Sequence, residues 1–319
     1  MFHRIILHIG RHKSGTSSLQ NWLATQRPVL HEQGILYPHS GSNNRIAHHA
    51  LAVELSPRQS EGKLLGELID GIKEEYDGEH TLLLSSEGLQ NIQNLCRVKD
   101  FIQAFSPREV LIICYMREHL DYAISAYRQM IHNQRRFVEF TPFCQSFSSM
   151  KPFFKRWRDL GTLDVSWYGR DRLLKGDIIY DFCNRTNIAP TDVLNIDRNP
   201  SIGGNLLAFK MICNNLDVFG GNYKHLSDLA ANHKPFSEGF HIRDAAASSV
   251  RAASNYNVSL FEELGEIQLK SWSTAPVIPN LKTLEEDLDK IQGHLGVPIT
   301  SSILDKLQVA GSWFALRET

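Results

Sequence analysis

The chain has 319 residues, of which 42% are apolar and 22% are charged, and its 34 Lys and Arg residues nearly balance its 35 Asp and Glu residues. This composition excludes a disordered or collagen-like chain, and a formal charge of -1 lacks the basic excess that binding to long nucleic acids requires. We therefore predict a globular protein with a large buried core and no nucleic-acid partner.

The cysteines and the apolar runs indicate the compartment. The five cysteines are scattered without CxxC or Cys/His spacing, which favours neither a disulfide framework nor a zinc site. The longest strongly apolar run, at residues 110–116, is far shorter than the roughly 20 residues that cross a bilayer. The N-terminus also lacks the apolar stretch of a signal peptide. We therefore expect a cytoplasmic protein with no transmembrane segment, of unknown oligomeric state.

Short apolar runs alternate with amphipathic stretches over the first two thirds of the chain. The predicted strands span residues 5–9, 34–37, 81–84, 110–115 and 165–168. The predicted helices between them span residues 14–24, 63–75, 98–105, 119–132, 147–158 and 178–187. This alternation predicts an α/β fold, in which a parallel sheet is the middle of three layers and helices cover both faces.

The strand signals fade after Gly203, and the remaining pattern is helical. Helices are predicted over residues 206–216, 244–253, 259–264 and 284–295. We therefore expect an α/β core over residues 1–216 and an α-rich C-terminal extension over 217–319, packed on the core within a single structural domain. Residues 220–237, with Gly220-Gly221 and Lys234-Pro235, are predicted to form a mobile surface loop.

The segment HIGRHKSGTSSL at residues 8–19 carries the most informative motif. A buried strand enters a glycine turn that opens directly into a helix, where free backbone N–H groups and the helix dipole can hold a phosphate. Gly10 and Gly15 have the Walker A spacing, but Thr16 stands where that motif requires lysine. Lys13 lies inside the loop instead. There its ammonium group would lie over the bond being broken, rather than along the β- and γ-phosphates of a nucleoside triphosphate. This position disfavours ATP or GTP hydrolysis.

The candidate donor-binding residues of this loop are Gly10, Arg11, Lys13, Ser14, Gly15, Thr16, Ser17 and Ser18. The alternative is a plain strand-to-helix turn with Ser14 as the N-cap and Lys13 in solvent. The strand before the loop, the helix after it and the run of hydroxyl side chains favour the anion site.

A second motif follows the predicted strand at residues 110–115. Arg117 comes at the end of this strand, and Ser125 follows eight residues later on the next helix. An arginine can hold two phosphate oxygens, and a serine hydroxyl can add a third contact. The alternative is a surface salt bridge from Arg117 to Glu118 or Asp121.

With these two motifs the sequence resembles the sulfotransferases that use 3′-phosphoadenosine-5′-phosphosulfate (PAPS), of the carbohydrate sulfotransferase type. Their 5′-phosphosulfate loop is similar to residues 10–18, and their 3′-phosphate motif is similar to Arg117 and Ser125. The resemblance implies a P-loop-like three-layer fold, PAPS as the sulfuryl donor and adenosine 3′,5′-bisphosphate (PAP) as the product.

The resemblance covers roughly residues 1–216. Residues 165–170 are similar to the family's late core strand, and residues 199–202 are similar to the segment before its C-terminal helices. Many members carry an Arg-Lys-Gly element near the C-terminus that closes on the donor, and this chain has no such tripeptide. Lys234 is a candidate replacement.

Sulfuryl transfer requires a cation at the leaving oxygen and a base for the acceptor proton, but no metal. Lys13 is the candidate cation. Glu87 is the first candidate base, because it follows the strand that ends in Ser85-Ser86, and the resemblance implies such a base in some carbohydrate sulfotransferases. His48 and His49, at the start of a predicted helix, are the rival candidates. The alternative roles are a helix-dipole carboxylate for Glu87 and solvated side chains for the histidine pair.

The expected acceptor is a hydroxyl of a carbohydrate or glycolipid. Residues 127–160 carry seven basic and two acidic side chains, which could receive an anionic head group or simply form a solvated helix face.

Two other functions stay open. A P-loop kinase or other phosphotransferase is disfavoured because no lysine follows Gly15 and no clear strand-borne Mg²⁺ aspartate is present. A nonenzymatic nucleotide-binding scaffold is disfavoured because the candidate catalytic residues are all present.

Overall fold

The computed structural model describes residues 2–42, 44–134, 137–190, 201–218, 223–296 and 298–309. The chain forms two compact units, each built from two segments. The first comprises Met1–Arg117 and Met150–Ile196, and the second comprises Glu118–Ser149 and Asp197–Thr319. The segment 118–149 thus belongs with the C-terminal helices, whereas the sequence-based division at residue 216 placed it with the sheet.

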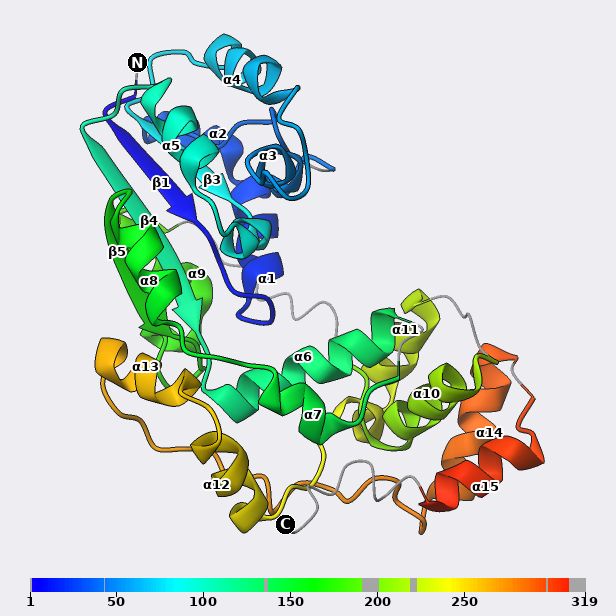
Figure 1. Cartoon of the computed structure of the whole chain (residues 1–319). Coiled ribbons are helices and arrows are strands. Elements are labelled where there is room, and N and C mark those ends of the chain that lie inside the picture. The colour runs from blue at the N-terminus through cyan, green and yellow to red at the C-terminus, as the bar shows by residue number, and fades with distance from the viewer. Residues whose placement is uncertain are drawn as a thin grey trace. The chain divides into compact units, whose positions relative to one another are not determined.

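The first unit is built around a five-stranded parallel sheet (Figure 1). Its strands are β1 (Arg4–His8), β2 (Ile35–Leu36), β3 (Thr81–Ser85), β4 (Glu109–Met116) and β5 (Thr162–Trp167). Their order across the sheet is β2-β3-β1-β4-β5, and every neighbouring pair is parallel. All five strands expected from the sequence are present, and the prediction of a parallel sheet is confirmed.

Both faces of the sheet are buried, as the apolar strand sequences require. The register places Ile6 beside Leu83 and Leu111, and these side chains share one apolar cluster with the helices α1 (Thr16–Thr25), α2 (Arg27–Glu32) and α9 (Ile178–Thr186). Helix α8 (Lys151–Arg158) contacts β5 and lies in front of the sheet in Figure 1, where α9 lies behind it. Helices therefore cover both faces, and the α/β prediction is confirmed at this level.

The remaining elements of the first unit are short helices in the segments that follow the strands β2, β3 and β5. They are α3 (His49–Glu54), α4 (Leu65–Glu74), the 3₁₀ helix η1 (Glu87–Asn91), α5 (Cys96–Gln103) and the 3₁₀ helix η2 (Leu174–Gly176). Helix α8 begins at Lys151, four residues later than predicted. Pro152 lies in its first turn, where its fixed φ favours a helix start.

The second unit contains helices and no strand within its described residues. They are α6 (His119–Asn133), α7 (Phe140–Gln145), α10 (Gly204–Leu216), α11 (Tyr223–Asn232), the 3₁₀ helix η3 (Lys234–Ser237), α12 (Asp244–Ala252), α13 (Tyr256–Leu264), α14 (Leu284–Leu295) and α15 (Ser301–Val309). Helix α10 is buried on every side over residues 204–214, as expected for the central helix of an apolar core.

The sequence-based expectation of a loop at residues 220–237 is wrong for residues 223–237. Helix α11 and η3 occupy this stretch, because Leu226, Leu229 and Ala230 recur at helical spacing and are buried in the core of the second unit. The Gly-Gly and Lys-Pro pairs on either side hid this short apolar face. Helices α2, α7 and α15 were also missed.

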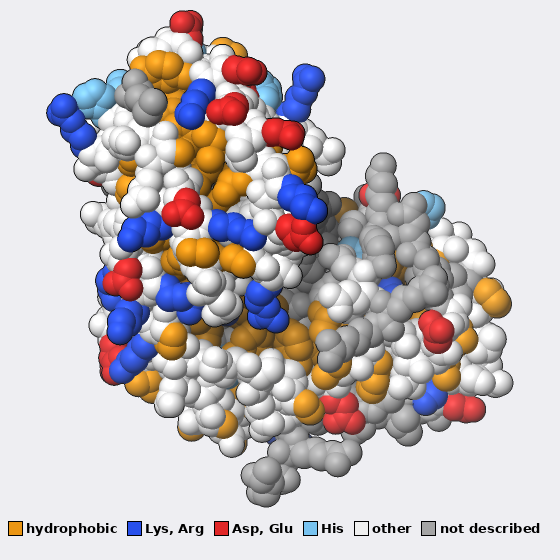
Figure 2. Space-filling view, turned by 45° about the horizontal axis from the view of Figure 1, so that its top comes forward, with side chains coloured by type: hydrophobic (Ala, Val, Ile, Leu, Met, Phe, Trp, Pro, Cys, Tyr) orange, Lys and Arg blue, Asp and Glu red, His pale blue; other side chains and the backbone are white. Residues whose placement is uncertain are grey.

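Figure 2 shows one face of the molecule, on which Lys and Arg side chains lie among Asp and Glu side chains. Positive and negative side chains are therefore interspersed on this face, as the balanced charge of the sequence suggests. Within the described residues, no helix has the length and apolar character needed to span a membrane.

Candidate functional site

The candidate residues of the first unit gather where β1, β3 and β4 end. From β1 the chain runs to β2, at one edge of the sheet, and from β4 it runs to β5, at the opposite edge. The carboxyl edge between strands whose connections run in opposite directions is where open parallel sheets bind ligands. Residues 9–15 follow β1 and Arg117 follows β4 directly, while Glu87 begins the 3₁₀ helix η1 just after β3.

The loop after β1 has an unusual backbone. Gly10 has φ +42°, Gly15 has φ +74° and Lys13 has φ +66°, a left-handed conformation that is uncommon for a residue with a side chain. A Cβ on Gly10 would lie 2.6 Å from Cγ2 of Thr16, so this position requires glycine on grounds of space as well as conformation. The Ser14 hydroxyl and the backbone of Arg11 are hydrogen-bonded to each other, which closes the loop.

Helix α1 begins without a side-chain cap. Gly15 is its N-cap residue and makes no side-chain hydrogen bond to the first turn. The alternative in which Ser14 caps the helix is therefore wrong, because that hydroxyl contacts Arg11 instead. An uncapped N-terminus leaves backbone N–H groups and the positive end of the dipole for an anion. In the first turn, Thr16 is buried, Ser18 is half-buried and Ser17 is exposed.

Arg117 joins the end of β4 to this loop. Its Nη1 donates to the carbonyl oxygen of Lys13 at 2.7 Å, and its guanidinium lies 5.7 Å from the centroid of the Tyr168 ring. The Glu118 carboxylate, one alternative partner for Arg117, accepts from Arg251 at 2.8 Å. Arg117 thus supports the backbone of the loop crown. Ser125 is a half-buried residue of α6 in the second unit, and its pairing with Arg117 stays a prediction.

Glu87 and His49 lie next to each other, although α3 and η1 carry them on separate segments. Oε1 of Glu87 is 3.7 Å from Nε2 of His49, and Oε2 accepts a hydrogen bond from Nε2 of Gln20 at 2.8 Å. Nδ1 of His49 is 2.7 Å from the Ser86 hydroxyl. The Glu87 side chain is 17% exposed and that of His49 is 37% exposed. Two of the rival base candidates therefore share one place in the site.

His48 is held inside the unit. Its Nδ1 accepts from the N–H of Ser85 at 3.1 Å, and its Nε2 is 3.0 Å from the carbonyl oxygen of Pro38. These partners occupy both ring nitrogens and require the neutral ring with its hydrogen on Nε2. Burial lowers the pKa of His48 to about 4, and backbone hydrogen bonds only partly oppose this shift. Its geometry makes His48 a structural residue, and the expectation that it could face an acceptor finds no support.

Two buried neutral histidines make the fold sensitive to acid. Burial also lowers the pKa of His8 to about 4, partly opposed by the Glu87 carboxylate. Below pH 6.5 the two histidines bind protons in the unfolded chain but stay neutral in the folded chain. The stability that they contribute above this pH is therefore lost as the pH falls toward 4. From pH 7 to 5.5 we expect each histidine to remove about 1 kcal/mol from the free energy of unfolding. Urea unfolding at both pH values measures this loss.

The variant His48→Asn provides the comparison for this prediction. It should lose less stability than the parent chain between pH 7 and 5.5, because one of the two buried groups is gone. The control His3→Asn removes an exposed histidine and should leave the difference unchanged. Equal losses in the parent chain and in His48→Asn would show that His48 does not carry the effect.

Sequence reasoning missed two residues of the site. The first is His12, whose pKa is lowered by burial. The Glu87 carboxylate raises this pKa, and the positive charges of Arg11, Lys13 and His49 lower it. His12 therefore lies within the electrostatic reach of the site. Its position between two basic residues of the loop was visible in the sequence. Gln20 had no such signal, because a glutamine five residues after Gly15 is also typical of a helix surface.

The basic segment at residues 127–160 is divided between the two units. Arg128 donates to the carbonyl oxygens of Ser201, Ile202 and Ser237 within the second unit. Arg128 is therefore a structural residue, while Arg135 and Arg136 lie outside the described residues. Lys234, the candidate closing residue, is an exposed residue of η3 in the second unit.

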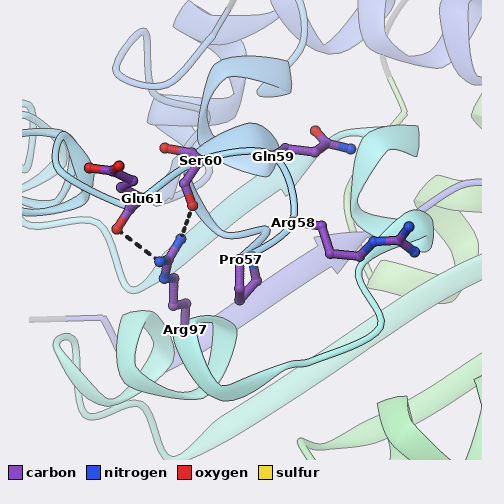
Figure 3. A pocket seen from close by; sticks show the side chains of 6 residues that line it. All are labelled: Pro57, Arg58, Gln59, Ser60, Glu61 and Arg97. Carbon is purple, nitrogen blue, oxygen red and sulfur yellow. Dashed lines mark hydrogen bonds between the residues drawn. The ribbon is translucent and has the colours of Figure 1, made fainter.

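A surface hollow in the first unit is lined by other residues (Figure 3). There Arg97 donates to the carbonyl oxygens of Glu54, Ser60 and Glu61, which holds the segment after α3 in place. The predicted site residues do not line this hollow.

No group of three or more His, Cys, Asp or Glu side chains is placed to hold a metal ion in the part of the chain that the structure describes. Metal-independent chemistry stays a prediction. Comparisons of the chain with models of known protein families, with curated protein sequences and with solved structures give no match. The function is therefore argued from the site itself.

Proposed function

We propose that the protein is a sulfotransferase that moves a sulfuryl group from PAPS to a hydroxyl of a carbohydrate or glycolipid acceptor. The observation that carries this proposal is the convergence of Lys13, Arg117 and Glu87 on the carboxyl edge of one parallel sheet, beside an uncapped helix N-terminus. We include in the proposal a P-loop-like core and a location in the cytoplasm.

Different groups of the chain would bind the donor, stabilise the leaving oxygen and accept the proton. The backbone N–H groups at the start of α1 and the hydroxyl groups of residues 14–18 would hold the 5′-phosphosulfate. Arg117, with Ser125, would hold the 3′-phosphate. Lys13 would stabilise the bridging oxygen as it takes up negative charge. Glu87 would accept the acceptor's proton.

At sulfur, the reaction forms one bond and breaks one. The acceptor oxygen attacks sulfur in line, the bond between sulfur and the bridging phosphate oxygen breaks, and its electron pair stays on PAP. The hydroxyl proton passes to the Glu87 carboxylate. No change of oxidation state occurs, so the donor, the acceptor and the side chains account for every atom and charge.

PAP is expected to bind much more tightly than ADP, because only PAP carries the 3′-phosphate that Arg117 is proposed to contact. Isothermal titration calorimetry on the full chain measures both affinities. In Arg117→Ala the affinity for PAP should fall by about 2 kcal/mol, the loss of a charge-assisted contact. The weak affinity for ADP should fall less, because only the support of the loop through the Lys13 carbonyl oxygen is lost there. Equal binding of ADP with Mg²⁺ and PAP would contradict the proposal and favour a phosphotransferase.

A further inference from the structure

Gln20 lies in contact with the proposed base, and no motif of the sequence accounts for it. The residue is 3% exposed, in a helix whose other buried residues include Leu19, Trp22 and Leu23. A buried amide without a partner is costly, so an apolar residue would suit this position if packing were its only role. The Gln20 amide instead donates to Oε2 of Glu87 at 2.8 Å.

The geometry of α1 explains how Gln20 reaches this carboxylate. Gln20 lies four residues after Thr16, so both lie on the same face of the helix. A Cβ placed on Gly10 would be 2.6 Å from Cγ2 of Thr16 and 3.4 Å from Cβ of Glu87. One face of α1 therefore meets the backbone of the donor loop and the Glu87 side chain together.

The two carboxylate oxygens of Glu87 have different surroundings. Oε2 accepts from Gln20, whereas Oε1 lies 3.7 Å from His49 Nε2, which is beyond hydrogen-bond distance. The Ser86 hydroxyl, which accepts from the N–H of Gly88, is also 2.7 Å from His49 Nδ1. Of the two Glu87 oxygens, Oε1 is the one with no hydrogen bond to a described residue.

We propose that Gln20 is a positioning residue for the proposed base. By holding Oε2, it leaves Oε1, which lies on the side of His49, as the atom that takes the acceptor's proton. This inference rests on the proposed function. It assigns a specific role to α1 beyond donor binding, because the helix that begins at the phosphosulfate loop also orients the base. Donor and base are then set by one rigid element, which transfer in line requires.

The test uses water as the acceptor, so that no sugar has to be identified. The full chain is incubated with PAPS, and sulfate release is measured together with calorimetric binding of PAP. In Gln20→Met, which keeps the length of the side chain and removes its donor, sulfate release should fall roughly 10-fold or more at unchanged PAP affinity. The control Gln33→Met removes a glutamine that hydrogen-bonds the backbone of Ala189 and should keep the parent rate.

A double-mutant comparison separates positioning from general stability. In a Glu87→Gln background, Gln20→Met should cause little further loss, because a residue that acts only through Glu87 has nothing left to position. Losses that multiply would overturn the inference, as would an unchanged rate in Gln20→Met when Glu87→Gln is impaired; both leave the proposed function standing. Failure of the parent chain to bind PAP would overturn the proposed function and this inference together. Gln20→Leu replaces Gln20→Met if thermal unfolding shows that the latter is not folded.

Discussion

Replacing Lys13 by alanine is expected to lower kcat for sulfuryl transfer by roughly 10²-fold or more, with a smaller effect on PAP binding. The reason is that the ammonium group at the crown of the loop is proposed to meet the charge that develops on the bridging oxygen in the transition state. A contact that strengthens only there changes turnover more than affinity. Sulfate release from PAPS and calorimetry with PAP measure the two effects.

The backbone at Lys13 supplies a control for this prediction. Its φ of +66° is strained for alanine as well as for lysine, whereas glycine adopts it freely. Lys13→Gly should therefore be as inactive as Lys13→Ala, with an undisturbed loop. Recovery of turnover in Lys13→Gly would show that a displaced loop in Lys13→Ala, and not the lost charge, caused the defect. An effect of Lys13→Ala confined to PAP affinity would assign Lys13 to donor binding and Arg117 to the leaving oxygen.

Glu87→Gln is expected to lower turnover by about 10²- to 10⁴-fold, the range for a lost general base. The amide has the same shape, and its oxygen can still accept from Gln20, which donates to Oε2 in the parent chain. The variant therefore changes the basicity of the group and little else, so PAP affinity should stay close to that of the parent. Rates with and without an acceptor, together with PAP titration, check this result.

The histidine variants decide between the rival bases. His49→Asn should raise the acceptor KM more than it lowers kcat, because His49 lies beside Glu87 and is tied to Ser86. His48→Asn should act on stability, because His48 is buried between Ser85 and Pro38. If His49→Asn is inactive yet binds PAP, while Glu87→Gln keeps near-normal kcat, then His49 is the base.

The sequence by itself determined the α/β class and the position of the strands. Apolar runs such as residues 81–84 are long enough to define buried strands, and their spacing leaves room for the helices that join parallel strands. It also placed Lys13, Glu87 and Arg117 in the segments that follow the ends of strands. Parallel strands bring such residues to one edge, so their neighbourhood followed from the chain order. The helix α11 was missed because its apolar face is short and lies between turn signals.

Only the tertiary structure decided what each polar residue contacts. His48 and His49 are adjacent in the sequence, yet one is buried against Pro38 and the other borders Glu87. The local pattern cannot separate them, because their surroundings come from β3 and the residues after it, 37 positions further along the chain. Gln20 obtained its partner in the same way, from packing of α1 against a segment 67 residues away. Chain order predicts which ends of strands meet, but side-chain burial and hydrogen bonding depend on how distant segments pack.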